Sequence, residues 1–118
     1  MGKRKGCKIM NFRELAENAG LEKEEFLVLV GLFIETSLFD LRKLQSAIDK
    51  GDLQKMVEAA HSIKGAARNL GFEDMYEVAE DIEIKAQKNV LEGTSGAVKY
   101  LQEKLGLISK DLGEPLYE

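Results

Sequence analysis

The sequence has few of the residues that build disulfides, metal sites and most cofactor sites. Its 118 residues include one cysteine, one histidine, one proline and no tryptophan. The single cysteine, Cys7, allows neither an intramolecular disulfide nor a thiolate metal site. One histidine cannot supply a multi-histidine metal cage. We therefore expect a reducing compartment and a chain that binds no metal or cofactor of its own.

Long hydrophobic runs and an excess of positive charge are also missing. The longest apolar stretch, residues 26–34, has nine residues, whereas a membrane span needs about 20. The basic N-terminal residues are not followed by the apolar region of a secretory signal. With 17 Lys and Arg against 21 Asp and Glu, the chain lacks the basic footprint of a dedicated nucleic-acid binder. These absences predict a cytoplasmic protein that binds neither nucleic acid nor a membrane.

The remaining composition is that of one globular domain. Hydrophobic residues make up 44% and charged residues 32% of the sequence, and the length suffices for one hydrophobic core. We expect residues 1–10 to form a disordered basic tail and residues 11–118 to form a single helical domain. No segment alternates with a period of two for long enough to predict a strand.

Capping signals and glycines divide the domain into five predicted helices, which span about residues 12–20, 22–49, 53–69, 73–89 and 95–112. Asn11 and Glu14 have the spacing of a capping box, and Asp52 suits an N-cap. Thr94 or Ser95 is expected to cap the last helix. Four long helices joined by short turns favour neighbours that pack antiparallel.

The predicted fold class is therefore all-α: an antiparallel up-down four-helix bundle with a short extra N-terminal helix that caps one end. The apolar stripes on the four main helices can all be buried within one such bundle. We therefore expect a monomer.

The predicted helix over residues 53–69 carries the only histidine. Its apolar residues gather into one stripe at about 100° per residue, and His61 lies about 120° from the centre of that stripe. His61 is therefore expected to be exposed on the flank of the bundle. Lys64, Gly65 and Arg68 follow three, four and seven residues later and share that flank. Taken singly, they have ordinary alternatives: a surface histidine, solvated charges and a tolerated helix glycine.

Gly65 is unexpected inside a helix, because it costs about 1 kcal/mol relative to alanine. The helical pattern continues beyond it, so a turn or a cap does not explain it. The remaining explanation is clearance, since a missing side chain lets a bulky group approach the imidazole. An accessible imidazole, a lysine one turn away and an open space suit a nucleophile that receives an anionic group.

A partner for the imidazole can be located from the turn that follows. In a hairpin folded about residues 71–72, a residue about eleven positions after the turn lies opposite His61. This geometry indicates Glu83, on the flank of the next apolar stripe. Its carboxylate would accept Nδ1–H and leave Nε2 free to attack. The alternative is one more surface acid on an acidic helix.

The segment over residues 60–72, AHSIKGAARNLGF, resembles the motif of the histidine-containing phosphotransfer (HPt) domain family. That motif has His, two residues, Lys, Gly, two small residues and a glycine-containing turn. The resemblance extends over about residues 26–88, and the family commonly has Gln or Glu at the position of Glu83. The chain departs from the pattern at Ala66 and Ala67, where small polar residues often occur.

The resemblance implies a phosphorelay intermediate. His61 would take a phosphoryl group from a receiver aspartate or a histidine kinase, which can be of the hybrid type, and pass it to another receiver aspartate. Lys64 would neutralise the phosphoryl oxygens, and Gly65 and Arg68 would lie where the partner docks. No ATP-binding module fits, so the chain would be a phosphocarrier and not an enzyme on its own. Magnesium would be bound by the receiver.

Two alternatives from other classes remain open. The first is a helical-bundle interaction module without phosphate chemistry. The second is a hydrolase with His61 as general base, which would lack a second catalytic group other than Glu83 and an evident pocket.

Overall fold

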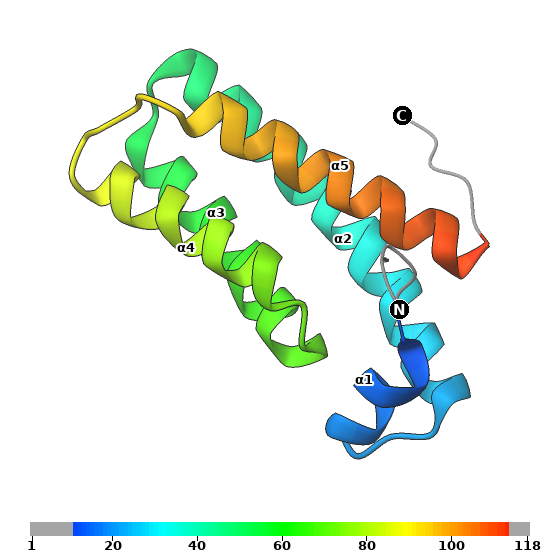
Figure 1. The fold of residues 1–118 in the computed structure, drawn as a ribbon. Coiled ribbons are helices and arrows are strands. Elements are labelled where there is room, and N and C mark those ends of the chain that lie inside the picture. Colours follow the sequence, from blue (N-terminus) through cyan, green and yellow to red (C-terminus); the bar gives the residue numbers. More distant parts are fainter. Residues whose placement is uncertain (1–10, 114–118) are drawn as a thin grey trace, which may run out of the picture.

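The structure is a computed structural model that describes residues 11–113. The predicted tail over residues 1–10, Cys7 and the last five residues lie outside this part. Within it the secondary structure is entirely helical, in the order α1 (Phe12–Asn18), α2 (Lys23–Lys50), α3 (Leu53–Leu70), α4 (Glu73–Gln87) and α5 (Thr94–Leu112) (Figure 1). The all-α prediction is confirmed.

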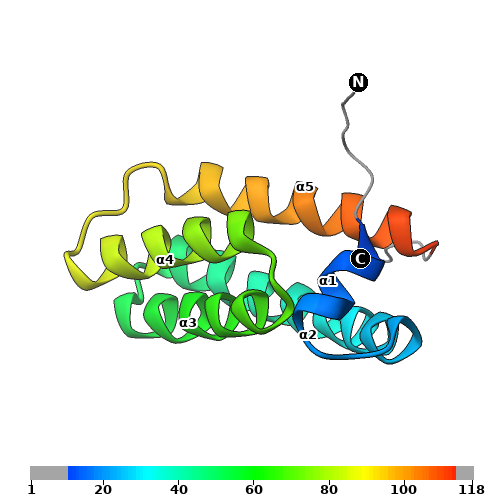
Figure 2. The ribbon, with the colours of Figure 1, turned by 60° about the horizontal axis from the view of Figure 1, so that its bottom comes forward.

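The four long helices form an antiparallel bundle. Each of α2, α3 and α4 packs against a neighbour in chain order, and α5 packs against both α4 and α2, which closes the ring. The short α1 lies against the N-terminal part of α2 at one end of the bundle (Figures 1 and 2). The predicted four-helix bundle with an extra N-terminal helix is therefore confirmed.

The packing of α3 against α4 positions the candidate site. These two helices make the most extensive contact of any pair. Their facing surfaces contain small buried residues, among them Ala60 and Ala67 of α3 and Ala79 and Ala86 of α4. Small side chains allow two helices to approach closely. Polar side chains at the edges of this contact are thereby brought within hydrogen-bonding distance.

Glycines end α2 and α3 as the sequence predicts. Gly51 and Gly71 follow these helices in the left-handed conformation, with φ of 69° and 84°, which glycine adopts without a steric penalty. The Asp52 side chain then caps α3 by accepting a hydrogen bond from the backbone N–H of Lys55 at 3.2 Å. These two tight turns fix the register of α2 on α3 and of α3 on α4.

Other helix boundaries differ from the prediction. The expected cap at Thr94 or Ser95 is wrong, because Gly93 is the N-cap and Thr94 is already helical. Thr94 is buried, and its hydroxyl donates to the carbonyl of Leu91 at 2.7 Å. At Asn11 only half of the predicted capping box is present. A complete capping box lies at the start of α2, between Glu22 and Glu25.

The apolar stripe of α2 is buried within the bundle as expected, but three apolar side chains on its opposite face are exposed. Val28, Leu32 and Phe39 are 65%, 53% and 58% exposed. Successive residues of a helix point in different directions, so the apolar run over residues 26–34 cannot be buried on one face. The stripes themselves are buried, so the monomeric state stays a prediction.

Candidate functional site

His61 lies on the outer face of α3, with 67% of its side chain exposed. The neighbouring core positions of α3, Ala60 and Ile63, are fully buried. The imidazole therefore stands on the rim of the bundle, where the helical rotation predicts it.

Glu83 of α4 lies opposite His61. Its Oε2 is 3.0 Å from His61 Nδ1, although the two residues are 22 positions apart in the chain. Glu83 is buried, with a relative exposure of 8%. The hairpin about residues 71–72 thus brings together the two residues that the sequence analysis pairs.

Lys64 reaches the other oxygen of the same carboxylate. Its Nζ lies 2.7 Å from Glu83 Oε1, and its side chain is 20% exposed. The ammonium therefore points toward α4 and forms an ion pair with Glu83, a contact that the sequence does not predict. One carboxylate on α4 joins two side chains of α3.

These contacts change the acidity of both charged groups. Burial raises the pKa of Glu83, but the contacts with Lys64 and His61 outweigh it, and the pKa falls below its ordinary value of 4.5. The contact with Glu83 raises the pKa of Lys64 above 10.5, against a smaller opposing effect of desolvation. At neutral pH the pair is therefore a carboxylate and an ammonium.

The ionised state of Glu83 decides which nitrogen of His61 carries the proton. A carboxylate can only accept hydrogen bonds. The 3.0 Å contact with Oε2 therefore assigns the hydrogen to Nδ1. In the neutral ring this leaves the Nε2 lone pair free, and the exposed edge of the imidazole becomes nucleophilic.

Gly65 leaves open space one turn beyond His61. A Cβ atom at this position would meet nothing within 4 Å beyond its own stretch of helix. Packing within the chain therefore does not require a glycine here, unlike at Gly51 and Gly71, where φ is positive.

Arg68, the last of the predicted site residues, lies over the ring of Tyr76, with its guanidinium carbon 5.8 Å from the ring centroid. This contact ties it to α4 and not to the imidazole. Sequence reasoning missed Tyr76, whose hydroxyl also donates to Glu80 at 3.3 Å. No signal in the sequence distinguishes this tyrosine from other residues at the edge of α4.

A second missed contact joins α3 to α2. The hydroxyl of Ser62, next to His61, donates to Asp40 Oδ2 at 2.6 Å. Asp40 and Ser62 lie eleven residues before and after Gly51. Equal distances from the α2–α3 turn therefore indicate Asp40 as a neighbour of Ser62, in the same way that equal distances from the α3–α4 turn indicate Glu83. His61 is therefore on a helix that polar contacts hold on both sides.

Other kinds of site are not found among residues 11–113. No group of three or more histidine, cysteine, aspartate and glutamate side chains in this part could hold a metal ion. None of the helices described is long and apolar enough to cross a membrane. The distinctive chemical feature of the described chain is the exposed imidazole held by a buried carboxylate.

Comparisons with known proteins identify the family and the fold of the chain. The family model of the Hpt domain matches residues 28–110. Among solved structures, the crystal structure of histidine-containing phosphotransfer protein B (HptB) from Pseudomonas aeruginosa PAO1 is similar, with a TM-score of 0.78 and 23% sequence identity. The alignment covers 92% of this chain and 94% of that chain. A search of curated proteins finds no match.

Proposed function

The chain belongs to the Hpt domain family of histidine phosphotransfer proteins, and from this premise we propose that it carries a phosphoryl group on His61 in a two-component phosphorelay. The group would come from a histidine kinase, hybrid or separate, or from a receiver aspartate, and would pass to another receiver aspartate. The contact of 3.0 Å between His61 Nδ1 and the buried Glu83 is the observation that supports this proposal most directly.

The chemistry follows from the assigned tautomer. The Nε2 lone pair attacks the phosphorus of an aspartyl phosphate, and an N–P bond forms. The P–O bond to the aspartate breaks, and its electron pair returns to the aspartate carboxylate. Positive charge develops on the ring during attack, and the Nδ1–H contact with the Glu83 carboxylate stabilises that charge. The reverse steps deliver the phosphoryl group to the next receiver.

Lys64 and Glu83 have complementary roles in this proposal. An ammonium has three N–H donors, so Lys64 can keep its ion pair with Glu83 and still donate to a phosphoryl oxygen. Its positive charge also offsets the carboxylate, which would otherwise repel the incoming anion.

Gly65 and Arg68 are proposed to form part of the docking surface. The open space at Gly65 admits the partner beside the imidazole. Arg68 is exposed and is supported by the Tyr76 ring, so its guanidinium is available to a docked protein.

The proposed partners supply the rest of the chemistry. We propose a phosphocarrier that has no ATP site and no metal of its own, acts as a single domain over residues 11–118 in the cytoplasm, and works as a monomer. Magnesium would be bound by the receiver, where it would stabilise the aspartyl phosphate.

The test is transfer from a phosphorylated receiver domain. Wild-type protein should acquire an acid-labile, base-stable label, and the His61→Gln variant should acquire none. Because His61 is exposed, this substitution should change the free energy of unfolding by less than about 0.5 kcal/mol. A label retained in His61→Gln would contradict the assignment. No label in the wild type with a panel of receivers and kinases would favour the interaction module.

A further inference from the structure

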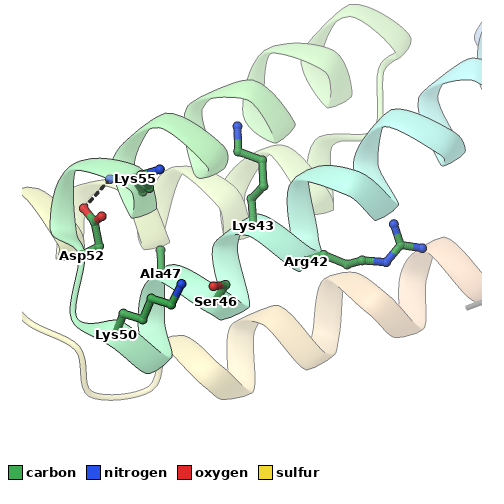
Figure 3. A pocket seen from close by; sticks show the side chains of 7 residues that line it. All are labelled: Arg42, Lys43, Ser46, Ala47, Lys50, Asp52 and Lys55. Atoms are coloured by element: carbon green, nitrogen blue, oxygen red, sulfur yellow. Dashed lines mark hydrogen bonds between the residues drawn. The ribbon is translucent and has the colours of Figure 1, made fainter.

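A cavity of about 330 Å³ opens beside the turn between α2 and α3, away from the His61–Glu83 contact (Figure 3). Its lining comes from the end of α2 and the start of α3 and includes Arg42, Lys43, Ala47, Lys50, Asp52 and Lys55. We refer to it as the basic pocket. Ala47 is buried, whereas all four cationic residues are exposed.

The charge of the basic pocket is opposite to that of the chain. The whole sequence has a net charge of −4, yet four cations and one carboxylate line this cavity. That carboxylate, Asp52, is engaged by the backbone N–H of Lys55 (Figure 3). Within residues 11–113, the ion pairs involve Lys64, Lys85 and Lys104 and none of the four pocket cations.

Three lysines make the centre of this positive surface. Lys50 and Lys55 lie on either side of the α2–α3 turn, and Lys43 lies about two helical turns before Lys50 on α2, whereas Arg42 extends away from them (Figure 3). Lys43 also lies 5.6 Å from the centroid of the exposed Phe39 ring. Positive charge and an exposed aromatic side chain are therefore adjacent on this surface.

The basic pocket is close enough to His61 to be covered by the same partner. Lys55 precedes His61 by six residues, which is a rise of about 9 Å along α3 and a rotation of about 120° around it. A standard protein interface covers about 800 Å² of each partner, which extends well beyond this distance. Lys55 also shares a side of α3 with Ser62, which contacts Asp40 of α2.

Exposure favours a protein over a free small anion as the occupant. Water and salt screen the attraction between exposed lysines and a small ion. A docked protein excludes water and presents several carboxylates at once. We therefore propose that the basic pocket binds an acidic surface segment of the protein that exchanges the phosphoryl group with His61. This proposal rests on the proposed function and adds a determinant of partner choice.

The basic pocket would act on association and not on the chemical step. Complementary charge accelerates diffusional encounter and suppresses wrong partners. A Lys43→Glu/Lys50→Glu/Lys55→Glu variant should therefore raise KM for transfer to the receiver that accepts fastest from the wild type, and leave kcat unchanged. At low ionic strength we expect a loss of about tenfold in kcat/KM, with a flattened or reversed salt dependence.

A matched variant controls for net charge. Lys88, Lys99 and Lys110 are exposed lysines on the α4 and α5 side of the bundle, and their replacement by Glu changes the total charge equally. This variant should retain the wild-type KM and salt dependence. Equal effects of the two triple variants would overturn the proposal, because net charge alone would then explain the loss.

Two further measurements separate the possible failures. Phosphoramidate, a small phosphoryl donor, should label His61 equally in the wild type and in the pocket variant. No labelling of the wild type by any donor would contradict the proposed function itself. Normal labelling together with unchanged transfer to the receiver would overturn only the pocket proposal. Inorganic phosphate provides a last check in NMR titrations. Tight, saturable binding at the Ala47 and Lys50 amides would also overturn the pocket proposal, because the pocket would then be a small-anion site.

Discussion

Glu83 connects two side chains of the neighbouring helix through separate oxygens, with Oε2 on His61 and Oε1 on Lys64. Without it, the buried edge of the imidazole would lose its acceptor and Lys64 would lose its counter-ion. A single carboxylate therefore sets both the tautomer of the ring and the position of the nearest cation. Substitutions of Glu83 can therefore distinguish its effect on the ring tautomer from its effect as the counter-ion of Lys64.

The first prediction concerns the tautomer. In Glu83→Ala, Nδ1–H has no acceptor, so the neutral ring should shift toward the Nε2–H form. In Glu83→Gln the side-chain carbonyl can still accept, so the Nδ1–H form should be retained. The ¹⁵N chemical shifts of the only histidine report this directly. Identical ring shifts in the wild type and Glu83→Ala would remove Glu83 from the site.

The second prediction concerns pH. The pKa of Glu83 lies below 4.5 in the folded chain, so the unfolded chain binds a proton more readily there. The stabilisation by Glu83 is therefore complete above pH 4.5 and is lost as the pH falls through the folded-state pKa. Denaturation of the wild type and Glu83→Gln across this range should give stability curves that converge at acid pH. Parallel curves would show that the carboxylate charge does not contribute to stability.

The third prediction concerns Gly65. Because a Cβ there meets nothing, Gly65→Ala should stabilise the protein by up to about 1 kcal/mol through helix propensity. Gly65→Gln should fold as well but slow transfer to a receiver, since the larger side chain occupies the docking space. Urea denaturation and transfer rates measure the two effects. Wild-type transfer by Gly65→Gln would show that clearance is not the reason for the glycine.

At the scale of the residue, the sequence predicts those site contacts that follow from helix geometry. The exposure of His61 and the position of Glu83 come from the rotation per residue and from equal distances to a turn. The ion pair of Lys64 with Glu83 is not predictable in this way, because a long flexible side chain can adopt many rotamers. Only the relative positions of the two packed helices select among them.

At the scale of the element, turn chemistry determines where the helices begin and end. Gly51 with Asp52, and Gly71, are strong signals, because only glycine adopts the left-handed conformation freely and an aspartate side chain can satisfy the first free N–H groups. The start of α5 is less predictable. Thr94 is a residue type that often caps helices, but it is buried inside the first turn, where its hydroxyl donates to the carbonyl of Leu91.

The fourth prediction concerns the cap of α3. Asp52→Ala removes the acceptor for the Lys55 N–H and should lower the free energy of unfolding by about 1 kcal/mol. Asp52→Ser should recover most of this loss, because serine is also a good N-cap. Chemical denaturation of both variants provides the comparison. An equal loss in the serine variant would indicate that the aspartate acts through its charge and not through the cap.

At the scale of the whole molecule, the fold class and the helix order follow from the sequence, because amphipathic periods and short turns leave few arrangements for four helices. The unburied apolar residues of α2 do not follow. Hydrophobic composition shows how much apolar surface a helix has, but only the completed bundle shows which part is covered. Phe39 and Leu32 remain outside because α3 and α5 cover the other faces of α2.

The length of α2 has a consequence for the motions of the protein. Phe33 of α2 packs against Phe72, with ring centroids 5.1 Å apart, and so marks the level of the α3–α4 turn. The ten residues of α2 before Phe33 therefore extend past that turn. Val28 and Leu32 are exposed in this part of α2, and the short α1 packs against it (Figure 2).

Local opening requires less free energy where fewer apolar contacts must be broken. Amide hydrogens over residues 27–32 should therefore exchange with deuterium faster than those over residues 37–48 of the same helix, as mass spectrometry or NMR can measure. Equal protection along α2 would contradict this. If the gradient is present, one end of the molecule opens and closes repeatedly while the α3–α4 hairpin keeps His61 and Glu83 in register.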